Sequence, residues 1–334
     1  MPHPSDKARW AGCRGGVDEV PIGVGQTPSA GPATVPPKSP GSPARCLTAR
    51  HCRHLSRPIH QRRVAPSTLN EDIVSRSSKA PSIFFAIGII GLGVLALVFG
   101  DFAEVGQTVP AWVPGRTGLA YASGIVMVLG GIGLLSSRTS ALSVRILLPF
   151  LILGFLVQAP TLVMPPFAEV NWESIGEVAT MVGGMWVLFA TRSGLAEGSR
   201  FAFATGDKGL RIARIFFGAA LLPIGISHYA YLKNTVSLVP AWLPFRTGWA
   251  YLTGAGHFAA GLGVLFSVVP RLAAAMEAGM LAIFTLSVWL PRIVATPAGG
   301  RGLWTEFVVS WTVTAAAWLI ADSFATSDPT PNRH

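Results

Sequence analysis

Two ionisable side chains lie deep inside long apolar stretches, where their types could exchange a proton or hold a ligand. His257 is nine residues into the stretch 248–268, so it lies ~13 Å from the start of a helix rising 1.5 Å per residue. Glu277 is six residues past Arg271, so it lies ~9 Å into the next stretch, entered from the opposite side. Ionisable groups inside membrane spans are costly and are functional candidates by default.

The expected relation between these two side chains depends on how the two stretches pack. If they form neighbouring helices, His257 and Glu277 pair, as a proton-handling pair or a ligand site. The alternative is an isolated buried histidine that hydrogen-bonds a Ser, a Thr or a carbonyl group. His228, near the end of an earlier stretch, is interpreted as a residue of the membrane interface.

A second set of candidates comes from a phrase that the chain writes twice. It runs VPAWVPGRTGLAY from Val109 to Tyr121 and VPAWLPFRTGWAY from Val239 to Tyr251. Two prolines around Ala-Trp predict a non-helical turn with few free N–H groups. A Trp in such a turn suits the headgroup level of a membrane. The tryptophans are Trp112 and Trp242, and the threonines that follow, Thr117 and Thr247, are predicted helix N-caps.

Each phrase also carries an arginine, Arg116 or Arg246, at the start of the predicted helix. A cation at a helix N-terminus opposes the helix dipole, so we expect an anionic group nearby. Structural candidates are a lipid phosphate or one of these carboxylates: Asp101, Glu104, Glu173 or Glu177 for the first arginine and Glu306 for the second. The functional interpretation is that both arginines hold an anionic or carbonyl-bearing ligand. Glu173 and Glu177 are otherwise interpreted as carboxylates favoured by the dipole at a helix start.

The elements that carry these residues are long apolar runs. Only 13% of the 334 residues are charged, against about a quarter in soluble domains. From residue 81 on, eight runs are each close to the ~20 residues that cross a hydrocarbon core. They cover about 82–100, 118–136, 141–163, 172–191, 210–232, 248–268, 271–290 and 303–322. The sequence therefore predicts an all-α integral membrane protein with eight transmembrane helices.

The eight predicted helices fall into two units of four, because several residues outside the phrase also recur. The matching positions are Gly124 with Gly254, Gly131 with Gly261, Gly133 with Gly263, Trp172 with Trp304 and Trp186 with Trp318. An even number of crossings gives both units the same direction, so they are parallel repeats rather than the inverted repeats of many transporters. The predicted units are residues 81–192 and 210–323, joined by a linker at 193–209 and followed by a short tail at 324–334.

Lys and Arg counts predict the orientation in the membrane. Connections on the side of the N-terminus hold nine of these residues and the opposite connections hold five. Because cytoplasmic loops carry the excess of Lys and Arg, both termini are predicted to be cytoplasmic, in the plasma membrane.

Residues 1–80 form a separate segment rich in Pro, Gly, Ser and Arg, and are predicted to be disordered. They hold 12 Lys and Arg against 5 Asp and Glu, whereas the rest of the chain holds 14 against 11. The basic balance is therefore no sign of nucleic-acid binding by the apolar region. We hypothesise that translation starts downstream of Met1, which N-terminal sequencing of natively expressed protein would test.

Several chemistries lack their motif in the sequence. All three cysteines lie in residues 1–80, and CLTARHCRH (residues 46–54) fits no common zinc pattern, so no metal site is predicted. No Gly-rich loop with Lys-Ser/Thr indicates ATP, and no nucleophile elbow or His-Glu-x-x-His motif occurs. No catalytic residue is therefore predicted.

The stretch VPAWLPFRTGWAYLTGAGHFAAGLGVLFSVVPRLAA (Val239–Ala274) resembles the DoxX-like membrane proteins. In that family a Pro-Trp-Leu-Pro turn precedes a Gly-rich second helix, a short basic turn follows, and the third helix ends near a proline, here Pro291 and, in the first unit, Pro160. The first unit resembles the family equally well. Relatives often carry a Glu midway along the second helix, where this chain has Met127 and His257.

The resemblance implies a four-helix bundle in each unit and little firm biochemistry. Some relatives are subunits of membrane redox complexes, among them a quinone-reducing thiosulfate oxidoreductase and an assembly involving superoxide dismutase. Three hypotheses follow. The first is a redox-linked subunit that binds a quinone or a partner protein, with Arg246 and Trp242 at an outer pocket and His257 deeper. The others are a small-molecule carrier that uses a cleft between the units, and a non-catalytic membrane scaffold.

Overall fold

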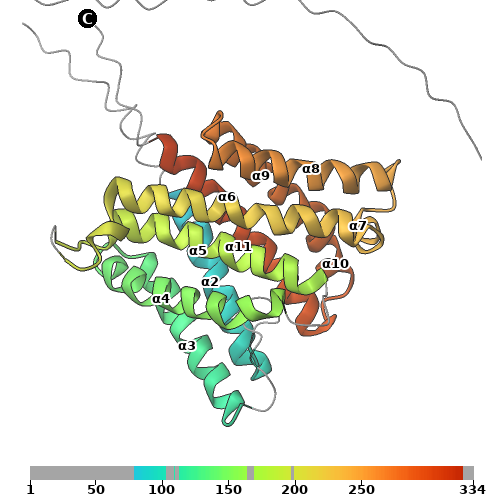
Figure 1. The fold of residues 1–334 in the computed structure, drawn as a ribbon. Helices are drawn as coiled ribbons and strands as arrows, with labels where there is room; N and C mark the ends of the chain where they lie inside the picture. The colour runs from blue at the N-terminus through green and yellow to red at the C-terminus, as the bar shows by residue number, and fades with distance from the viewer. Residues whose placement is uncertain (1–78, 103–108, 110–112, 164–168, 197–198, 326–334) are drawn as a thin grey trace, which may run out of the picture. The chain divides into compact units, whose positions relative to one another are not determined.

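The computed structural model describes residues 79–102, 109, 113–163, 169–196 and 199–325, and their regular structure is entirely helical. The first half comprises α2 (Ala80–Phe99), α3 (Arg116–Leu134), α4 (Ser140–Gln158), the 3₁₀ turn η1 (Ala159–Leu162) and α5 (Glu169–Arg192). The second half comprises α6 (Gly206–Ala230), α7 (Leu232–Leu238), α8 (Arg246–Leu265), α9 (Pro270–Phe284), η3 (Thr285–Trp289), α10 (Leu290–Ala295) and α11 (Gly300–Ala325), after the 3₁₀ turn η2 (Ala202–Ala204). Figure 1 shows their arrangement. The predicted disordered segment and most of the C-terminal tail lie outside the described residues.

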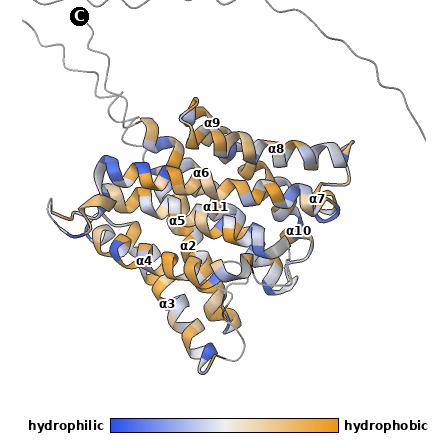
Figure 2. Ribbon diagram, viewed as in Figure 1, coloured by the Kyte–Doolittle hydropathy of each residue, from blue (hydrophilic) through white to orange (hydrophobic). Residues whose placement is uncertain are grey.

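Seven of these helices are long and apolar enough to cross a membrane. They are α2, α3, α4, α5 from Asn171, α6, the continuous α9–η3–α10 segment, and α11. The helix α8 is 20 residues long but lies outside this set, because its sequence mixes small and polar residues with apolar ones. Apolar residues predominate along the long helices in Figure 2, and hydrophilic ones gather near helix ends. The chain is therefore an integral membrane protein by the length and composition of its helices.

The repeated phrase has the same backbone at its end in both halves. Gly115 and Phe245 stand immediately before α3 and α8, and both adopt the left-handed conformation, at φ 67° and 53°. The helices begin at Arg116 and Arg246, and no side chain of the described residues caps either one. The prediction that the threonines Thr117 and Thr247 are N-caps is therefore wrong. The left-handed residue turns the chain into the helix one residue earlier than the threonines suggest.

Glycines bring the first and second long helices of each half into close contact. A Cβ added to Gly93 on α2 would lie 2.7 Å from the carbonyl oxygen of Gly124 on α3. In the second half, a Cβ on Gly225 of α6 would lie 3.2 Å from the carbonyl oxygen of Gly254 on α8. Small residues at helix crossings let backbones approach in this way. The glycines that recur in the sequence are thus packing residues in both halves.

The helix neighbours also correspond between the halves. In the first half α2 packs on α3, α3 on α4 and α4 on α5; in the second half α6 packs on α8, α8 on α9 and α9 on α11. Between the halves, α5 packs on α6 and α11 packs on α2, and α5 and α11 also contact each other. The last helix of each half therefore lies against the first helix of the other.

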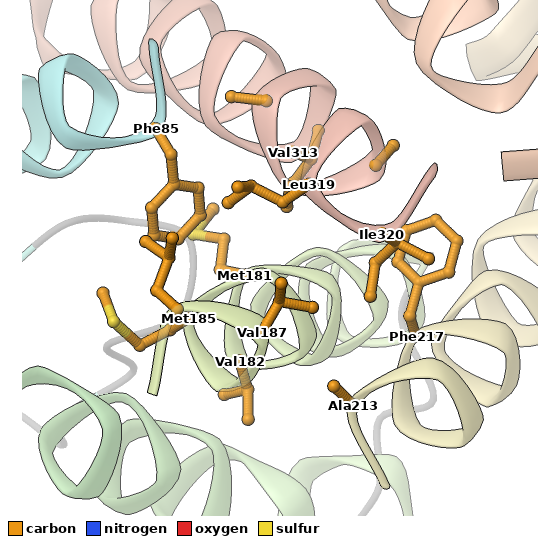
Figure 3. Close-up of a cluster of buried hydrophobic side chains, with 14 of the residues drawn as sticks. Phe85, Met181, Val182, Met185, Val187, Ala213, Phe217, Val313, Leu319 and Ile320 are labelled. Carbon is orange, nitrogen blue, oxygen red and sulfur yellow. The ribbon is translucent and has the colours of Figure 1, made fainter. Parts of the chain in front are cut away.

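The core lies where the halves meet. Phe85 on α2 and Phe217 on α6 are both fully buried. Figure 3 shows them with apolar side chains of α5 and α11, including Met185 and Ile320. Each phenylalanine is the last residue of an Ile-Phe-Phe triplet, which the sequence carries once in each half. The repeated positions therefore meet the same pair of central helices.

The second half differs from the first in its third long helix. After Phe284 the chain forms one π-helical turn, Thr285–Trp289, before α10 resumes. Pro291 explains the interruption, because a proline inside a helix cannot donate to the carbonyl four residues earlier and its ring clashes with it. Single π turns are frequent at functional sites. Three residues of this turn, Ser287, Val288 and Trp289, line the cavity described next.

Candidate ligand cavity

A buried histidine–glutamate pair lies in the second half. His257 Nδ1 and Glu277 Oε1 are 2.7 Å apart, and the two side chains are 1% and 0% exposed. The pair forms because α8 and α9 are antiparallel neighbours, so a residue midway along one meets a residue midway along the next. The expected pairing of His257 with Glu277 is confirmed by this contact.

The far end of each partner is buried and has no hydrogen-bond partner among the described residues. These two atoms are His257 Nε2 and Glu277 Oε2. A buried net charge costs several kcal/mol, so the pair is best buried without one. Two such states exist: an imidazolium beside a carboxylate, or a neutral imidazole accepting from a carboxyl group. Nε2 carries a hydrogen in both states, so it is a donor without an acceptor.

His257 stands in the wall of a cavity of about 330 Å³ formed by α5, α6, α7, α8, α9, η3 and α11. The wall is mainly apolar and aromatic, with Trp242, Trp249, Trp289 and Phe284 among its residues. The second copy of the repeated phrase contributes Val239, Pro240, Trp242 and Leu243 at one end of the cavity. Small-molecule sites typically have volumes of about 300–1,000 Å³ and this composition.

The wall also holds carboxylates and a histidine that the sequence did not bring together. Glu173 and Glu177 stand one helical turn apart on α5, and Glu306 comes from α11. His228 on α6 donates through Nδ1 to the Ile224 carbonyl at 2.9 Å, and its ring lies 4.8 Å from that of His257. Placing His228 at the interface is therefore wrong, since it is 7% exposed and lies beside the buried pair. The i, i+4 spacing of the two α5 glutamates was the available signal.

Glu277 lines a second hollow, a groove of about 610 Å³ between α8 and α9. Its other residues include Phe266, Val268 and Val269 of the α8–α9 turn and Met276. The cavity reaches the loop before α8, and the groove reaches the turn after α8, so they open toward opposite ends of that helix. The His257–Glu277 pair lies between them.

The first arginine of the repeated phrase forms an ion pair. Arg116 contacts the carboxylate of Asp101, which also binds Arg301 at the start of α11. Arg116 Nε also donates to the Val109 carbonyl at 3.0 Å. Asp101 is thus the carboxylate partner among the described residues; Glu104 lies outside them. Partial burial acts to raise the pKa of Asp101, but hydrogen bonds and charge from Arg301, with Arg116 and the Phe102 amide, hold it below its ordinary value of 3.8.

The second arginine has backbone partners. Arg246 Nε donates to the Val239 carbonyl at 3.0 Å, the counterpart of the bond from Arg116 to Val109. Its Nη2 donates to the Val236 carbonyl at 2.7 Å and contacts that of Ser237 at 3.4 Å. Both arginines therefore close their turn on the valine that begins the phrase. Arg246 is not among the residues that line the cavity, whereas Trp242 is; Trp112 lies outside the described residues.

The equivalent centre of the first half is apolar. In the register that aligns the two phrases, Met127 corresponds to His257 and Leu147 to Glu277. The two apolar side chains are 2% and 0% exposed. Leu147 packs against Gly130, where an added Cβ would lie 2.7 Å from its side chain. The pair and the cavity wall that it joins thus belong to the second half.

Comparison with known proteins adds one match. Residues 217–321 match the model of a family described as a domain of unknown function (DUF8561). The match lies wholly within the second half and includes His257, Glu277 and Glu306. A search of curated proteins and a search of solved structures each return no match.

Proposed function

We propose that the second half binds an apolar ring compound with carbonyl oxygens, of the quinone class, and that the protein is a redox-linked membrane subunit. One observation carries the proposal. A buried histidine in the wall of an aromatic cavity has an Nε2 without a partner among the described residues, while a buried glutamate holds its other nitrogen.

The ligand class follows from what this nitrogen lacks. In both uncharged states of the pair Nε2 is a donor, so a ligand carbonyl oxygen would satisfy it. An unmet buried donor costs about 1–3 kcal/mol, and a ligand acceptor would recover that free energy. The rings of Trp249, Trp289 and Phe284 in the wall suit a flat ring by stacking or edge contacts.

The wider architecture is part of the same proposal. We infer that the two halves are tandem DoxX-like four-helix units, parallel in the membrane, giving eight spans with α8 as the least apolar. Corresponding glycine contacts and corresponding helix neighbours support this arrangement. Some DoxX-like proteins serve membrane redox complexes, which fits a quinone ligand and a redox partner protein. The plasma membrane and two cytoplasmic termini complete the proposal.

The proposal is tested by titrating the detergent-purified protein with a short-tailed quinone and following tryptophan fluorescence. Three wall tryptophans, Trp242, Trp249 and Trp289, provide the signal. We expect saturable quenching in the unaltered chain and only linear, collisional quenching in His257→Met/Glu277→Leu. That double variant gives the second half the residue pair that the first half already carries at Met127 and Leu147.

The matched control is Met127→Leu, which changes the equivalent position in the first half. It should quench like the unaltered chain. Saturable quenching that persists in the double variant would place the ligand elsewhere and overturn the proposal, as would its absence from the unaltered chain.

A second candidate function, a small-molecule carrier, is favoured by the carboxylates. Glu173, Glu177 and Glu306 line the same cavity as three tryptophans, and carboxylates with aromatic rings suit a small organic cation. Uptake of radiolabelled tetraethylammonium into protein-containing vesicles separates the two. Uptake that depends on Glu306, without saturable quinone quenching, would favour the carrier.

A further inference from the structure

We propose that His257 and Glu277 form a gated proton relay that links the cavity to the groove. The pair is the wall between two hollows that open toward opposite ends of α8. His257 belongs to the lining of the cavity and Glu277 to that of the groove. This activity requires no bound quinone, so it goes beyond the function proposed above.

The relay follows from the order of atoms across the pair. His257 Nε2 is the end atom on one side, Nδ1 is hydrogen-bonded to Glu277 Oε1 at 2.7 Å, and Oε2 is the end atom on the other side. Both end atoms are buried without partners among the described residues. Each terminus can therefore take or give a proton while the inner bond stays formed.

The proton balance closes without any other reactant. A proton from the cavity joins Nε2 of a neutral imidazole beside the Glu277 carboxylate and makes an imidazolium. The Nδ1 proton then passes to Oε1, leaving a neutral imidazole and a carboxyl group. The carboxyl group releases its proton toward the groove, and rotation of the imidazole ring returns a hydrogen to Nδ1. One proton has then moved between the hollows, and no electron has been transferred.

Charged and titratable groups on the neighbouring helices face the cavity end of the relay. The His228 ring on α6 lies beside the His257 ring, and the carboxylates come from α5 and α11. They are Glu173, Glu177 and Glu306. Carboxylates around a proton acceptor attract protons from the adjoining solution, because like-signed groups focus the local potential. On the groove side, the described lining is apolar apart from Glu277.

The relay is closed in this conformation, since both end atoms are shielded. The π turn Thr285–Trp289 begins two helical turns after Glu277 on the same helix. A π turn stores one extra residue and lets a helix change register. A shift there would expose Oε2 or Nε2 in turn, which makes the relay gated rather than an open pore.

Proton flux into vesicles tests the relay directly. The full chain is reconstituted in synthetic, quinone-free lipid with the pH dye pyranine inside, and a potassium gradient with valinomycin drives protons inward. We expect acidification faster than in protein-free vesicles. Glu277→Gln keeps the size and a hydrogen bond to His257 but cannot carry the proton, so its rate should fall to the protein-free rate.

Two further variants keep the result interpretable. His257→Met/Glu277→Leu should match the protein-free rate, and Met127→Leu should match the unaltered chain. Equal rates in the unaltered chain and in empty vesicles, or an undiminished rate in Glu277→Gln, would overturn the relay. Because the vesicles contain no quinone, loss of quinone binding with intact flux, or the reverse, separates the two proposals.

Discussion

At the position where the second half carries His257, the first half carries Met127, and Glu277 corresponds to Leu147. Both pairs are buried between the second and third long helices of their half. One pair is apolar and packed against glycine; the other is polar and leaves two atoms unpartnered among the described residues. The same helical frame therefore holds a structural centre in one half and a chemically competent centre in the other.

The features that the halves share teach which parts build the frame. Both have the glycine crossings, the buried phenylalanine and an arginine bonded to the valine that opens the phrase. The duplicated phrase is thus explained by the turn that it makes. The differences gather around the cavity, in His257, Glu277 and the π turn. Substitutions at corresponding positions should therefore have unequal effects.

Breaking the buried pair should have the largest effect on stability. His257→Met removes one partner and leaves Glu277 buried alone, which typically costs about 3–5 kcal/mol. His257→Met/Glu277→Leu should recover most of that loss, because a buried pair replaced by packed apolar residues is often neutral. Thermal unfolding in detergent measures both. A double variant less stable than the single one would contradict the equivalence of the two centres.

The glycine crossings should respond unequally to alanine. A Cβ on Gly93 meets a backbone oxygen at 2.7 Å and two side-chain carbons at 2.9 Å, whereas one on Gly225 meets its nearest atoms at 3.1 Å. Overpacking costs about 1–3 kcal/mol, so Gly93→Ala should be clearly destabilising and Gly225→Ala less so. The comparison is made on unfolding midpoints of the two variants. The reverse order would mean that the halves pack differently from this account.

The left-handed residue before each helix gives a smaller effect. Phe245 is 87% exposed and adopts φ 53°, a conformation that costs an L residue about 1–2 kcal/mol. Phe245→Gly copies Gly115 and should raise stability by less than ~1 kcal/mol, because glycine has the greater freedom when unfolded. The matched exchange Gly115→Phe should lower it. If Phe245→Gly destabilises the chain, the exposed ring has contacts of its own.

The smallest effect concerns the two arginines. The pair of Arg116 with Asp101 is about one quarter exposed on each side, so it contributes about 0.2–1 kcal/mol. Because the folded pKa of Asp101 lies below its ordinary value of 3.8, this stability is present above pH 3.8 and is lost as the pH falls through the folded pKa. Asp101→Asn should remove both the acid sensitivity and part of the salt sensitivity, as measured by unfolding midpoints across pH and salt. Arg246→Gln should alter neither, since its partners are carbonyl groups.

Much of the helical frame could be predicted from the sequence. Long apolar runs located all eight helices to within a few residues, and seven pass as spans. Opposite depths along two consecutive runs were enough to pair His257 with Glu277. Local chemistry misplaced the helix starts at Arg116 and Arg246, because a phenylalanine in a left-handed conformation is not readable from residue type.

The cavity could not be predicted, because it depends on helices distant in the chain. Glu177 on α5 and Glu306 on α11 line the same wall only because the last helices of the two halves touch. Along the sequence they are two carboxylates near helix starts, which the dipole already explains. The bond from Arg246 to Val236 likewise depends on the short helix α7, which no apolar run announced.

The most direct test of the central claim is a solvent extract of the protein purified from its native membrane, assayed for quinone by redox difference absorbance and by mass. The account predicts near-stoichiometric quinone in the unaltered chain and in Met127→Leu, and none in His257→Met/Glu277→Leu. Phospholipid alone in all three, or equal quinone in the double variant, would contradict a ligand site at His257.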